Sequence, residues 1–302
     1  MYIPKTQNNA LAAALILIAA AFIGATTLIA KSLSTETYGP PLHALQISHG
    51  RFVFAFMALS LVAMVLRPTL STFHWKLHIA RTTFGWAGVT LLFAAVAFIP
   101  LADATAISFL NPVFAMMLAI PLLGEKVGRV RWSAAGLALI GAVVLLRPTP
   151  DSFQPAALLA LAAAMIMGLE LIFMKKLAGR ENPFQILLIN NSIGLCIASL
   201  AVLPFWQPPT GPQWMLLAGI GLCMAVAQTC FINAMARADA SFVAPFSYAS
   251  LIFASLYDFW FFDVVPDGVT VLGAIIIISG AIWLALREAR LKKPAPQPSR
   301  AV

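Results

Sequence analysis

The chain has 302 residues, of which 10% are charged and 61% are hydrophobic. Soluble globular domains carry about 25% charged residues, and the mean hydropathy of this chain is +0.91. The composition excludes a disordered chain, a disulfide scaffold and an ordinary soluble enzyme, and it predicts an integral membrane protein.

An α-helix of about 20 apolar residues crosses a bilayer core of about 30 Å. Ten segments of the chain meet this requirement. Their apolar residues run continuously instead of alternating, which favours helices over barrel strands. We therefore predict an all-α integral membrane protein with ten transmembrane helices. Their bounds are about 10–30, 42–66, 82–99, 103–123, 132–147, 155–174, 184–204, 213–233, 241–262 and 268–286.

The basic residues divide unequally between the two sides of these spans. The side of the N-terminus holds 16 of them, the opposite side holds Lys31 and Arg147, and Arg51 lies inside the second span. Cytoplasmic connections collect Lys and Arg, so we predict that both termini are cytoplasmic and that the chain is multi-pass in a bacterial cytoplasmic (inner) membrane. The net charge of +8 then reports orientation and implies no nucleic-acid partner. The 16 residues are Lys5, Arg67, Lys76, Arg81, Lys126, Arg129, Arg131, Lys175, Lys176, Arg180, Arg237, Arg287, Arg290, Lys292, Lys293 and Arg300.

Landmark residues recur at a nearly constant spacing of 136 to 144 positions, which indicates an internal repeat of five helices. Since five is odd, the two halves are expected to have opposite orientations, as in many secondary transporters. We predict a first repeat over residues 1–150, a second over 151–291 and a disordered cytoplasmic tail over 292–302. The matched positions are Gly24 with Gly168, Lys31 with Lys175, Ala102-Asp103-Ala104 with Ala238-Asp239-Ala240, and Glu125 with Asp263.

Both halves contain motifs that resemble the EamA-type repeat of the drug/metabolite transporter superfamily. In the first half these are Ile99-Pro100-Leu101-Ala102, Asn111-Pro112-Val113-Phe114 and Leu123-Gly124-Glu125-Lys126, and in the second Ala238-Asp239-Ala240 and Ala244-Pro245-Phe246-Ser247-Tyr248. The resemblance implies ten helices as two inverted five-helix repeats, a central cavity and alternating access without ATP. It also implies a small organic substrate, such as an amino acid, a vitamin, a nucleotide-like metabolite or a drug.

Ionisable residues inside a span are costly to bury and are functional candidates for that reason. Arg51 is expected in the outer leaflet, either as a binding site for a substrate carboxylate or as a structural arginine. Glu170 is expected near the cytoplasmic end of the sixth span, either as a proton-coupling or cation-binding carboxylate or as an interfacial acid beside Lys175 and Lys176.

The repeat and the expected depth in the membrane identify two further candidate functional residues. Thr26 is the repeat equivalent of Glu170, so the first half has no second copy of that carboxylate. Asp258 lies near the outer end of the ninth span, at a depth similar to that expected for Arg51. An ion pair between Asp258 and Arg51 that closes the outer mouth is a hypothesis.

Prolines inside spans break the helical hydrogen-bond ladder, and such backbone is tolerated where it lines a cavity. Pro112 and Pro245 are expected to break the fourth and ninth spans. Polar and aromatic residues around them are predicted to line the substrate cavity, with contacts between helices as the alternative. The predicted residues are Ser108, Asn111, Phe246, Ser247 and Tyr248, together with Gln228 in the eighth span.

These features predict a secondary active transporter for a zwitterionic or neutral, partly aromatic metabolite such as an amino acid, a flavin-like vitamin or a drug, with proton coupling as a further hypothesis. The alternative is an intramembrane enzyme acting on lipid-linked substrates, but its acids, His and Cys would have to cluster at one face. No cofactor or metal is expected, because His74 and His78 have no third ligand nearby. The expected partners are the substrate and the lipid bilayer, and the chain is expected to be a monomer or a homodimer.

Overall fold

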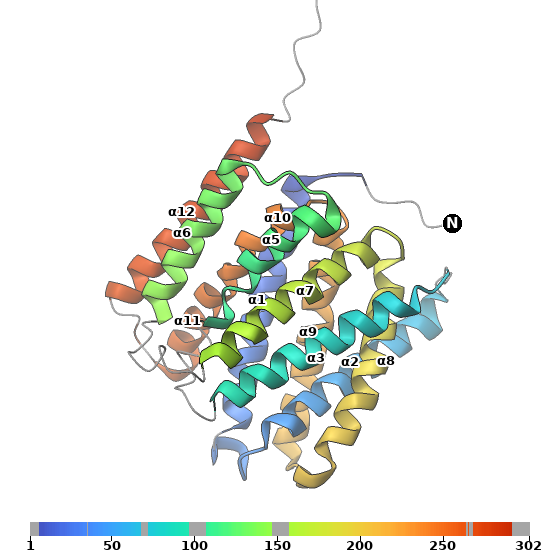
Figure 1. The fold of residues 1–302 in the computed structure, drawn as a ribbon. Helices are drawn as coiled ribbons and strands as arrows, with labels where there is room; N and C mark the ends of the chain where they lie inside the picture. The colour runs from blue at the N-terminus through green and yellow to red at the C-terminus, as the bar shows by residue number, and fades with distance from the viewer. Residues whose placement is uncertain are drawn as a thin grey trace, which may run out of the picture.

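The computed structural model describes residues 6–34, 36–67, 72–96, 107–146, 157–263, 265 and 268–291, and the regular structure within them is entirely helical (Figure 1). The first half contains α1 (Asn9–Leu33), α2 (Ala44–Leu66), α3 (Trp75–Val96), α5 (Asn111–Leu123) and α6 (Arg129–Leu146). The second half contains α7 (Ala157–Ala178), α8 (Pro183–Val202), α9 (Gly211–Met235), α10 (Ala240–Val243), α11 (Ala249–Phe262) and α12 (Gly268–Leu291). Short 3-10 helices are η1 (Glu36–Tyr38), η3 (Leu203–Phe205) and η4 (Ala244–Tyr248).

Six helical segments in the described part of the chain are long and apolar enough to cross a membrane. Each of the ten predicted spans overlaps one helix, or the interrupted series α10–η4–α11 in the case of the ninth span. The prediction of an all-helical, ten-helix membrane protein is therefore confirmed. The six segments are Asn9–Ala30, Ala44–Val65, Ala157–Ala178, Pro183–Phe205, Gly211–Met235 and Ala240–Phe261.

Turn residues between the spans cap the helices that follow them. The Thr210 hydroxyl accepts a hydrogen bond from the Gln213 backbone N–H, and the Gln213 side chain accepts one from the Thr210 N–H, so that a capping box begins α9. Gln213 also donates to the Pro40 carbonyl at 2.8 Å, which joins this connection to the one between α1 and α2. At the start of α8, the Asn182 side chain accepts from the Phe184 N–H at 3.0 Å.

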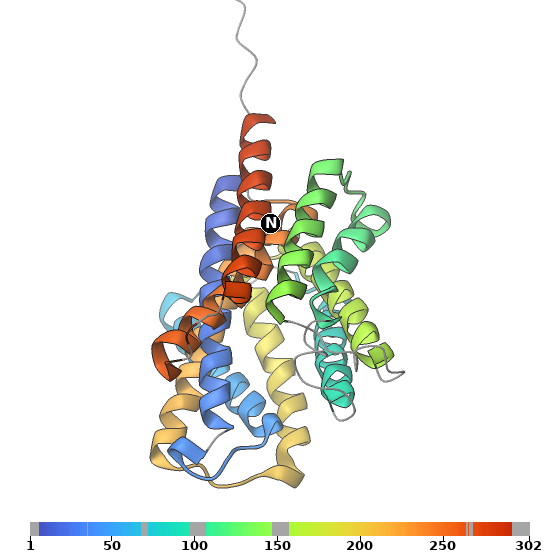
Figure 2. The ribbon, with the colours of Figure 1, turned by 90° about the vertical axis from the view of Figure 1, so that its left-hand side faces the viewer.

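Helix packing follows a two-fold pattern that exchanges the two halves. The helix α1 packs on α9 and α11, whereas its counterpart α7 packs on α3 and α5. Two other strong pairs join equivalent helices, since α2 packs on α8 and α6 packs on α12 (Figures 1 and 2). The helix α2 also packs on α9, and this contact is larger than its counterpart between α8 and α3. This exchange is the arrangement expected of two inverted five-helix repeats.

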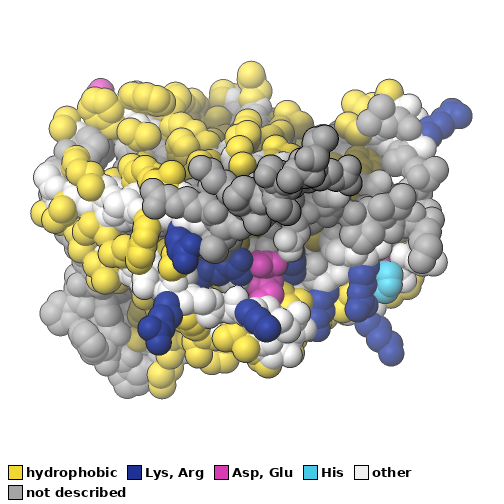
Figure 3. All heavy atoms as spheres, turned by 90° about the horizontal axis from the view of Figure 1, so that it is seen from above, with side chains coloured by type: hydrophobic (Ala, Val, Ile, Leu, Met, Phe, Trp, Pro, Cys, Tyr) yellow, Lys and Arg dark blue, Asp and Glu magenta, His cyan; other side chains and the backbone are white. Residues whose placement is uncertain are grey.

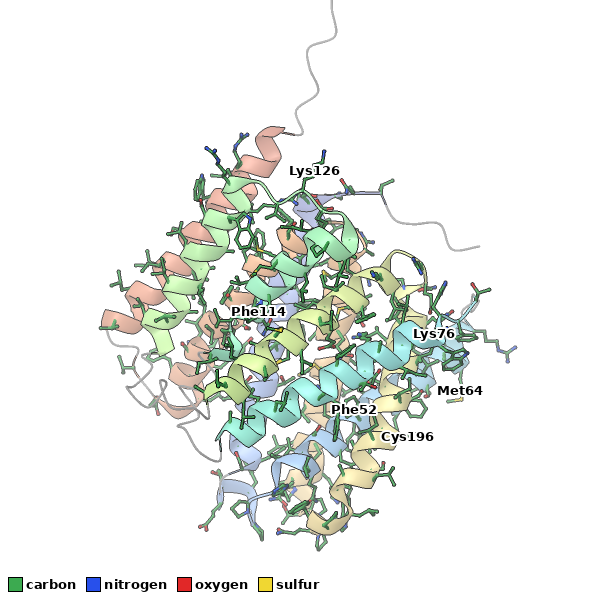
Figure 4. The ribbon with its side chains drawn as sticks, in the orientation of Figure 1. Phe52, Met64, Lys76, Phe114, Lys126 and Cys196 are labelled. Carbon is green, nitrogen blue, oxygen red and sulfur yellow. The ribbon has the colours of Figure 1, made fainter. Side chains whose placement is uncertain are left out.

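Two equivalent glycines show how closely the halves approach each other. A Cβ atom on Gly24 of α1 would lie 3.0 Å from Phe253 Cβ and 3.1 Å from the next backbone nitrogen in α11. A Cβ atom on Gly168 of α7 would lie 2.9 Å from Phe114 Cβ and 3.0 Å from the next backbone nitrogen in α5. Figure 4 labels Phe114. Glycine at helix crossings lets backbones approach closely inside a membrane, and here the same contact is built twice.

Both proline-containing spans are interrupted, and one helix begins earlier than predicted. A turn at residues 109 and 110 separates the helical residues 107–108 from α5, and Pro112 occupies the first turn of α5, where a proline removes no helical hydrogen bond. Pro245, as expected, interrupts its span, because it lies in η4 between α10 and α11. The helix α3 begins at Trp75 instead of about residue 82, which places Arg81 inside the helix. The predicted boundary at residue 150 and the tail over 292–302 lie outside the described residues.

We expect Gly24→Ala and Gly168→Ala each to lower stability by about 1–3 kcal/mol, because the added methyl group meets backbone atoms that cannot move aside. Thermal unfolding of the detergent-purified protein measures the effect. Gly136→Ala in α6 is the matched control, since no atom of the described residues lies within 4 Å of its Cβ position. Equal melting temperatures for all three variants would show that these crossings tolerate a side chain.

Candidate functional site

A cavity of about 130 Å³ lies between helices of the two halves. The first half contributes α2 and α3, and the second half contributes α7, α8 and α9. Figure 4 labels Phe52 of α2, whose ring packs against Gly194 of α8. The cavity wall therefore mixes polar and aromatic groups at the junction of the repeats. The polar residues are Ser48, Arg51, Thr82, Glu170, Asn190 and Gln228, and the aromatic residues are Phe52 and Trp86.

Three charged residues meet at this cavity. Arg51 and Glu170 line it, and Arg81 Nε lies 3.9 Å from Glu170 Oε1. Glu170 interacts electrostatically with Arg81 and with Arg51. The Arg51 guanidinium also lies 4.3 Å from the centre of the Phe52 ring, within the range of a cation–π interaction. Two cations and one anion thus share one site.

Arg81 is the main correction to the sequence analysis, which placed it in a connection outside the spans. Its side chain is 1% exposed, and its Nε and Nη1 atoms have no hydrogen-bond partner among the residues that the structure describes. Arg51 and Glu170, which were expected toward opposite sides of the membrane, line one cavity. The residue Gly85 is a signal that sequence reasoning missed. It lies one helical turn after Arg81, and a Cβ atom there would lie 2.9 Å from the Glu170 carboxyl carbon.

Amide side chains on α8 and α9 are held in place along the same cavity. The Thr82 hydroxyl donates to Asn190 Oδ1 at 3.2 Å, which links α3 to α8. Asn191 Nδ2 donates to the Leu187 carbonyl at 2.9 Å and to Gln228 Oε1 at 3.4 Å, which links α8 to α9. Asn190 and Gln228 are therefore oriented by neighbours that the sequence pattern did not connect with them.

The other predicted site residues do not line this cavity. The Thr26 hydroxyl donates to the Ile23 carbonyl, and the Ser247 hydroxyl donates to the Ala244 carbonyl, so both satisfy their own helices. Asn111 Nδ2 donates to the Ser108 carbonyl at 3.0 Å. The Tyr248 hydroxyl donates to the Phe109 carbonyl at 2.6 Å, which joins the two halves. The Asp258 side chain lies outside the described part of the structure, so its pairing with Arg51 stays a prediction.

Pro245 and Phe246 lie at a second, apolar site. This groove has a volume of about 350 Å³ and runs between α1, η4, α11 and α12. Its described lining consists of Ala, Leu, Ile, Phe and Pro side chains, so it offers no polar group that would orient a metabolite. The prediction that Phe246 binds substrate together with Tyr248 in one polar cavity is not supported by this placement.

A polar cluster, here called the clasp, joins the two halves at one end of the bundle. The Glu125 carboxylate accepts hydrogen bonds from the Ala240 N–H at 2.8 Å and from the Ser241 N–H at 3.1 Å, at the start of α10. Arg131 Nη1 donates to Asp239 Oδ2 at 3.0 Å and to the Ser241 hydroxyl at 2.8 Å. Lys and Arg side chains surround acidic side chains in the view of this end in Figure 3.

Lys175 of α7 also belongs to the clasp. Its Nζ atom donates to the Met235 carbonyl at 2.7 Å and to the Ala238 carbonyl. Glu125 thus binds the N–H groups that begin α10, while Lys175 binds carbonyls at the end of α9. Both interactions complement the partial charges of helix ends. The turn between α9 and α10 is therefore fixed by side chains from α6, from α7 and from the connection between α5 and α6.

Glu181, in the connection between α7 and α8, is fully buried. Its Oε1 atom accepts from the His74 N–H at 2.7 Å, and His74 Nδ1 lies 2.8 Å away. His78 Nε2 lies 2.8 Å from Oε2, which also accepts from Gln185 at 2.7 Å. Burial acts to raise the pKa of Glu181, but the hydrogen bonds from His78 and His74 outweigh it, so the pKa lies below its ordinary value. His74 and His78 therefore bind a carboxylate. Among the described residues, no group of three or more His, Cys, Asp or Glu residues has the arrangement of a metal site.

We expect Glu125→Ala to increase amide hydrogen exchange at residues 239–243 by at least about tenfold, since charge-assisted hydrogen bonds contribute about 1.5–3 kcal/mol each. Hydrogen exchange followed by mass spectrometry measures this. Glu36→Ala, at an exposed carboxylate in η1, is the control and should leave the segment unchanged. Unchanged exchange in Glu125→Ala would show that the clasp does not hold the turn.

The stability supplied by ionised Glu181 should depend on pH. Because its folded pKa is lowered, the contribution is present above the unfolded value of about 4.3 and is lost as the pH falls through the folded pKa. We expect the difference in melting temperature between wild type and Glu181→Gln to be largest near neutral pH and to narrow in acid. A difference that stays constant from about pH 7 to pH 3 would contradict this assignment.

Comparisons with known proteins agree with this architecture. A family model described as the EamA-like transporter family matches residues 10–147 and 154–286, which are the two halves. A riboflavin transporter of Vibrio cholerae is 34% identical and aligns over 74% of this chain and 76% of its own. An S-adenosylmethionine uptake transporter of Rickettsia bellii is 26% identical over 86% and 89% of the two chains. A solved crystal structure with 21% identity superposes with a TM-score of 0.78, covers 92% of this chain and 98% of its own, and shows the same fold. The chain therefore belongs to the EamA-like transporter family, with one copy of the family's domain in each half.

Proposed function

We propose that this protein is a secondary active transporter that moves a small organic metabolite across the bacterial inner membrane by alternating access, without ATP. The observation that carries the proposal is the cavity between the halves, where the partly exposed Arg51 and Glu170 lie in the wall and the buried Arg81 lies beside Glu170. Ionisable groups at this depth are costly and mark substrate or ion pathways. A site at the junction of inverted repeats can be exposed to either side when the halves rock against each other.

The cavity wall favours a substrate that carries both a ring and polar groups. The Phe52 and Trp86 rings supply flat apolar surfaces on which an aromatic or heterocyclic substrate can stack. Asn190 and Gln228 supply amide donors and acceptors that can orient its polar edge. Riboflavin and S-adenosylmethionine, the substrates named for two relatives, both contain heterocycles. They are the first compounds to test, beside amino acids.

Glu170 is the proposed site of proton coupling. Glu170 lines the cavity and interacts electrostatically with Arg81 and Arg51, so a change in its protonation alters the charge available to a substrate. Its repeat equivalent is Thr26, whose hydroxyl is bonded within its own helix. The carboxylate proposed for proton coupling therefore has no equivalent carboxylate at the matching position of the first half. We further propose that both termini face the cytoplasm, in accord with the distribution of Lys and Arg.

The test is uptake of radiolabelled riboflavin, S-adenosylmethionine and amino acids into proteoliposomes with an imposed pH gradient. At least one compound should accumulate saturably, without chemical change, and lose its accumulation when a protonophore collapses the gradient. Glu170→Gln should abolish proton-driven accumulation while exchange of internal for external substrate continues. The control Glu36→Gln alters an exposed carboxylate in η1 and should transport normally.

Two results would contradict the proposal. Chemical conversion of a substrate by the reconstituted protein would favour the alternative, an intramembrane enzyme acting on lipid-linked substrates. Accumulation that is equally proton-driven in wild type and Glu170→Gln would remove Glu170 from the coupling role.

A further inference from the structure

The charges around the cavity do not balance. Among the described residues that line it, Arg51 and Glu170 are the charged ones, and Arg81 adds a second guanidinium directly beside Glu170. With all three ionised, the site carries one net positive charge. Buried ionisable groups inside membranes usually pair with one another or with backbone carbonyls, so this site lacks one anion.

Arg81 shows the deficit at the level of atoms. Its distance of 3.9 Å from Glu170 is an ion-pair distance and is too long for a hydrogen bond. Among the described residues, its buried Nε and Nη1 atoms have no hydrogen-bond partner, although a buried unsatisfied donor costs about 1–3 kcal/mol or more when charged. Gly85 allows the Glu170 carboxylate to rest against α3, because any side chain there would displace it.

We infer that the missing anion is a carboxylate carried by the substrate, and that Arg81 prepares the site for it by competing with Arg51 for Glu170. Glu170 interacts electrostatically with both guanidinium groups. When the substrate carboxylate binds Arg51, Glu170 becomes the partner of Arg81 alone, and each cation has one anion. Arg81 is thus a positioning residue and Arg51 a binding residue. This inference rests on the proposed function, since it names the substrate class of the same site.

The charge and size of the site define the substrate more narrowly. One net positive charge is neutralised by a monocarboxylate, whereas a phosphate dianion would leave the buried site negative. The cavity of about 130 Å³ is close in volume to cavities of about 150 Å³ that bind benzene. The rings of Phe52 and Trp86 lie in the same wall as Arg51. The geometry therefore fits a carboxylate attached to a single aromatic or heterocyclic ring.

The test uses benzoate as the probe and benzamide as its neutral isostere. Both are titrated into the full-length protein in lipid nanodiscs, with calorimetry or the fluorescence of Trp86 and its neighbours as the readout. Wild type should bind benzoate at least about tenfold more tightly than benzamide, which corresponds to one charge-assisted interaction. Arg51→Gln should remove this preference while benzamide binding persists, which shows that the variant is folded.

Arg81 is tested by a double-mutant cycle with Glu170. In Arg81→Gln, Arg51 is the remaining guanidinium partner of Glu170. Because Glu170 then competes with benzoate for Arg51, benzoate binding should weaken by at least about tenfold. Glu170→Gln should bind benzoate at least as tightly as wild type. In the double variant Arg81→Gln/Glu170→Gln, Arg51 is again free, and benzoate binding should recover to within about threefold of wild type. A purely structural role for Arg81 would give no such recovery.

Three outcomes would overturn the inference. They are equal binding of benzoate and benzamide, no binding of benzoate by wild type, and no recovery in the double variant. Each of these can occur while proteoliposomes still transport a neutral substrate, so failure of the carboxylate site is distinguishable from failure of the transport function. Conversely, selective benzoate binding without transport of any compound would retain the site and contradict the transporter.

Discussion

The cost of burying charge within an apolar bundle is the constraint on which the rest of this structure depends. Hydrocarbon offers no solvent to an ionised side chain, so charged residues are confined to the helix ends or to sites where they have partners. Here the ends of the helices hold the clasp and Glu181, whereas the interior holds Arg51, Arg81 and Glu170. The carboxylates of the clasp and of Glu181 are hydrogen-bonded, whereas within the described part of the chain His78 Nδ1 beside Glu181 and the Nε and Nη1 atoms of Arg81 have no hydrogen-bond partner.

The two-fold arrangement of helices explains why such a site lies between the halves. Gly24 and Gly168 bring α1 against α11 and α7 against α5 through equivalent contacts. The strong contacts of α1 and α7 are made with the opposite half, so neither half encloses a cavity alone. Side chains from α2 and α3 must meet side chains from α7, α8 and α9 to complete the wall. A relative movement of the halves would therefore open or close this site directly.

The chemistry of the site departs from the symmetry of the backbone. The position of Glu170 is occupied by Thr26 in the first half, and Thr26 is bonded to its own helix. Arg51 and Arg81 come from the first half, and the carboxylate between them comes from the second. The helix packing is thus approximately two-fold, whereas the charged residues around the cavity are not related by that symmetry.

The sequence by itself determined the membrane class, the ten helices, the repeat and the candidacy of Arg51 and Glu170. Those conclusions depend on hydropathy, charge asymmetry and the spacing of landmarks such as Gly24 and Gly168, which are properties of the chain read in order. Only the tertiary structure decided which charges meet. Arg81 looked like part of a connection until α3 was found to begin at Trp75. Asn111 and Tyr248 donate to the backbone carbonyls of Ser108 and Phe109 instead of lining the cavity. The reason is physical: a cavity is formed where helices cross, and the crossing points are set by packing between residues that are far apart in the chain.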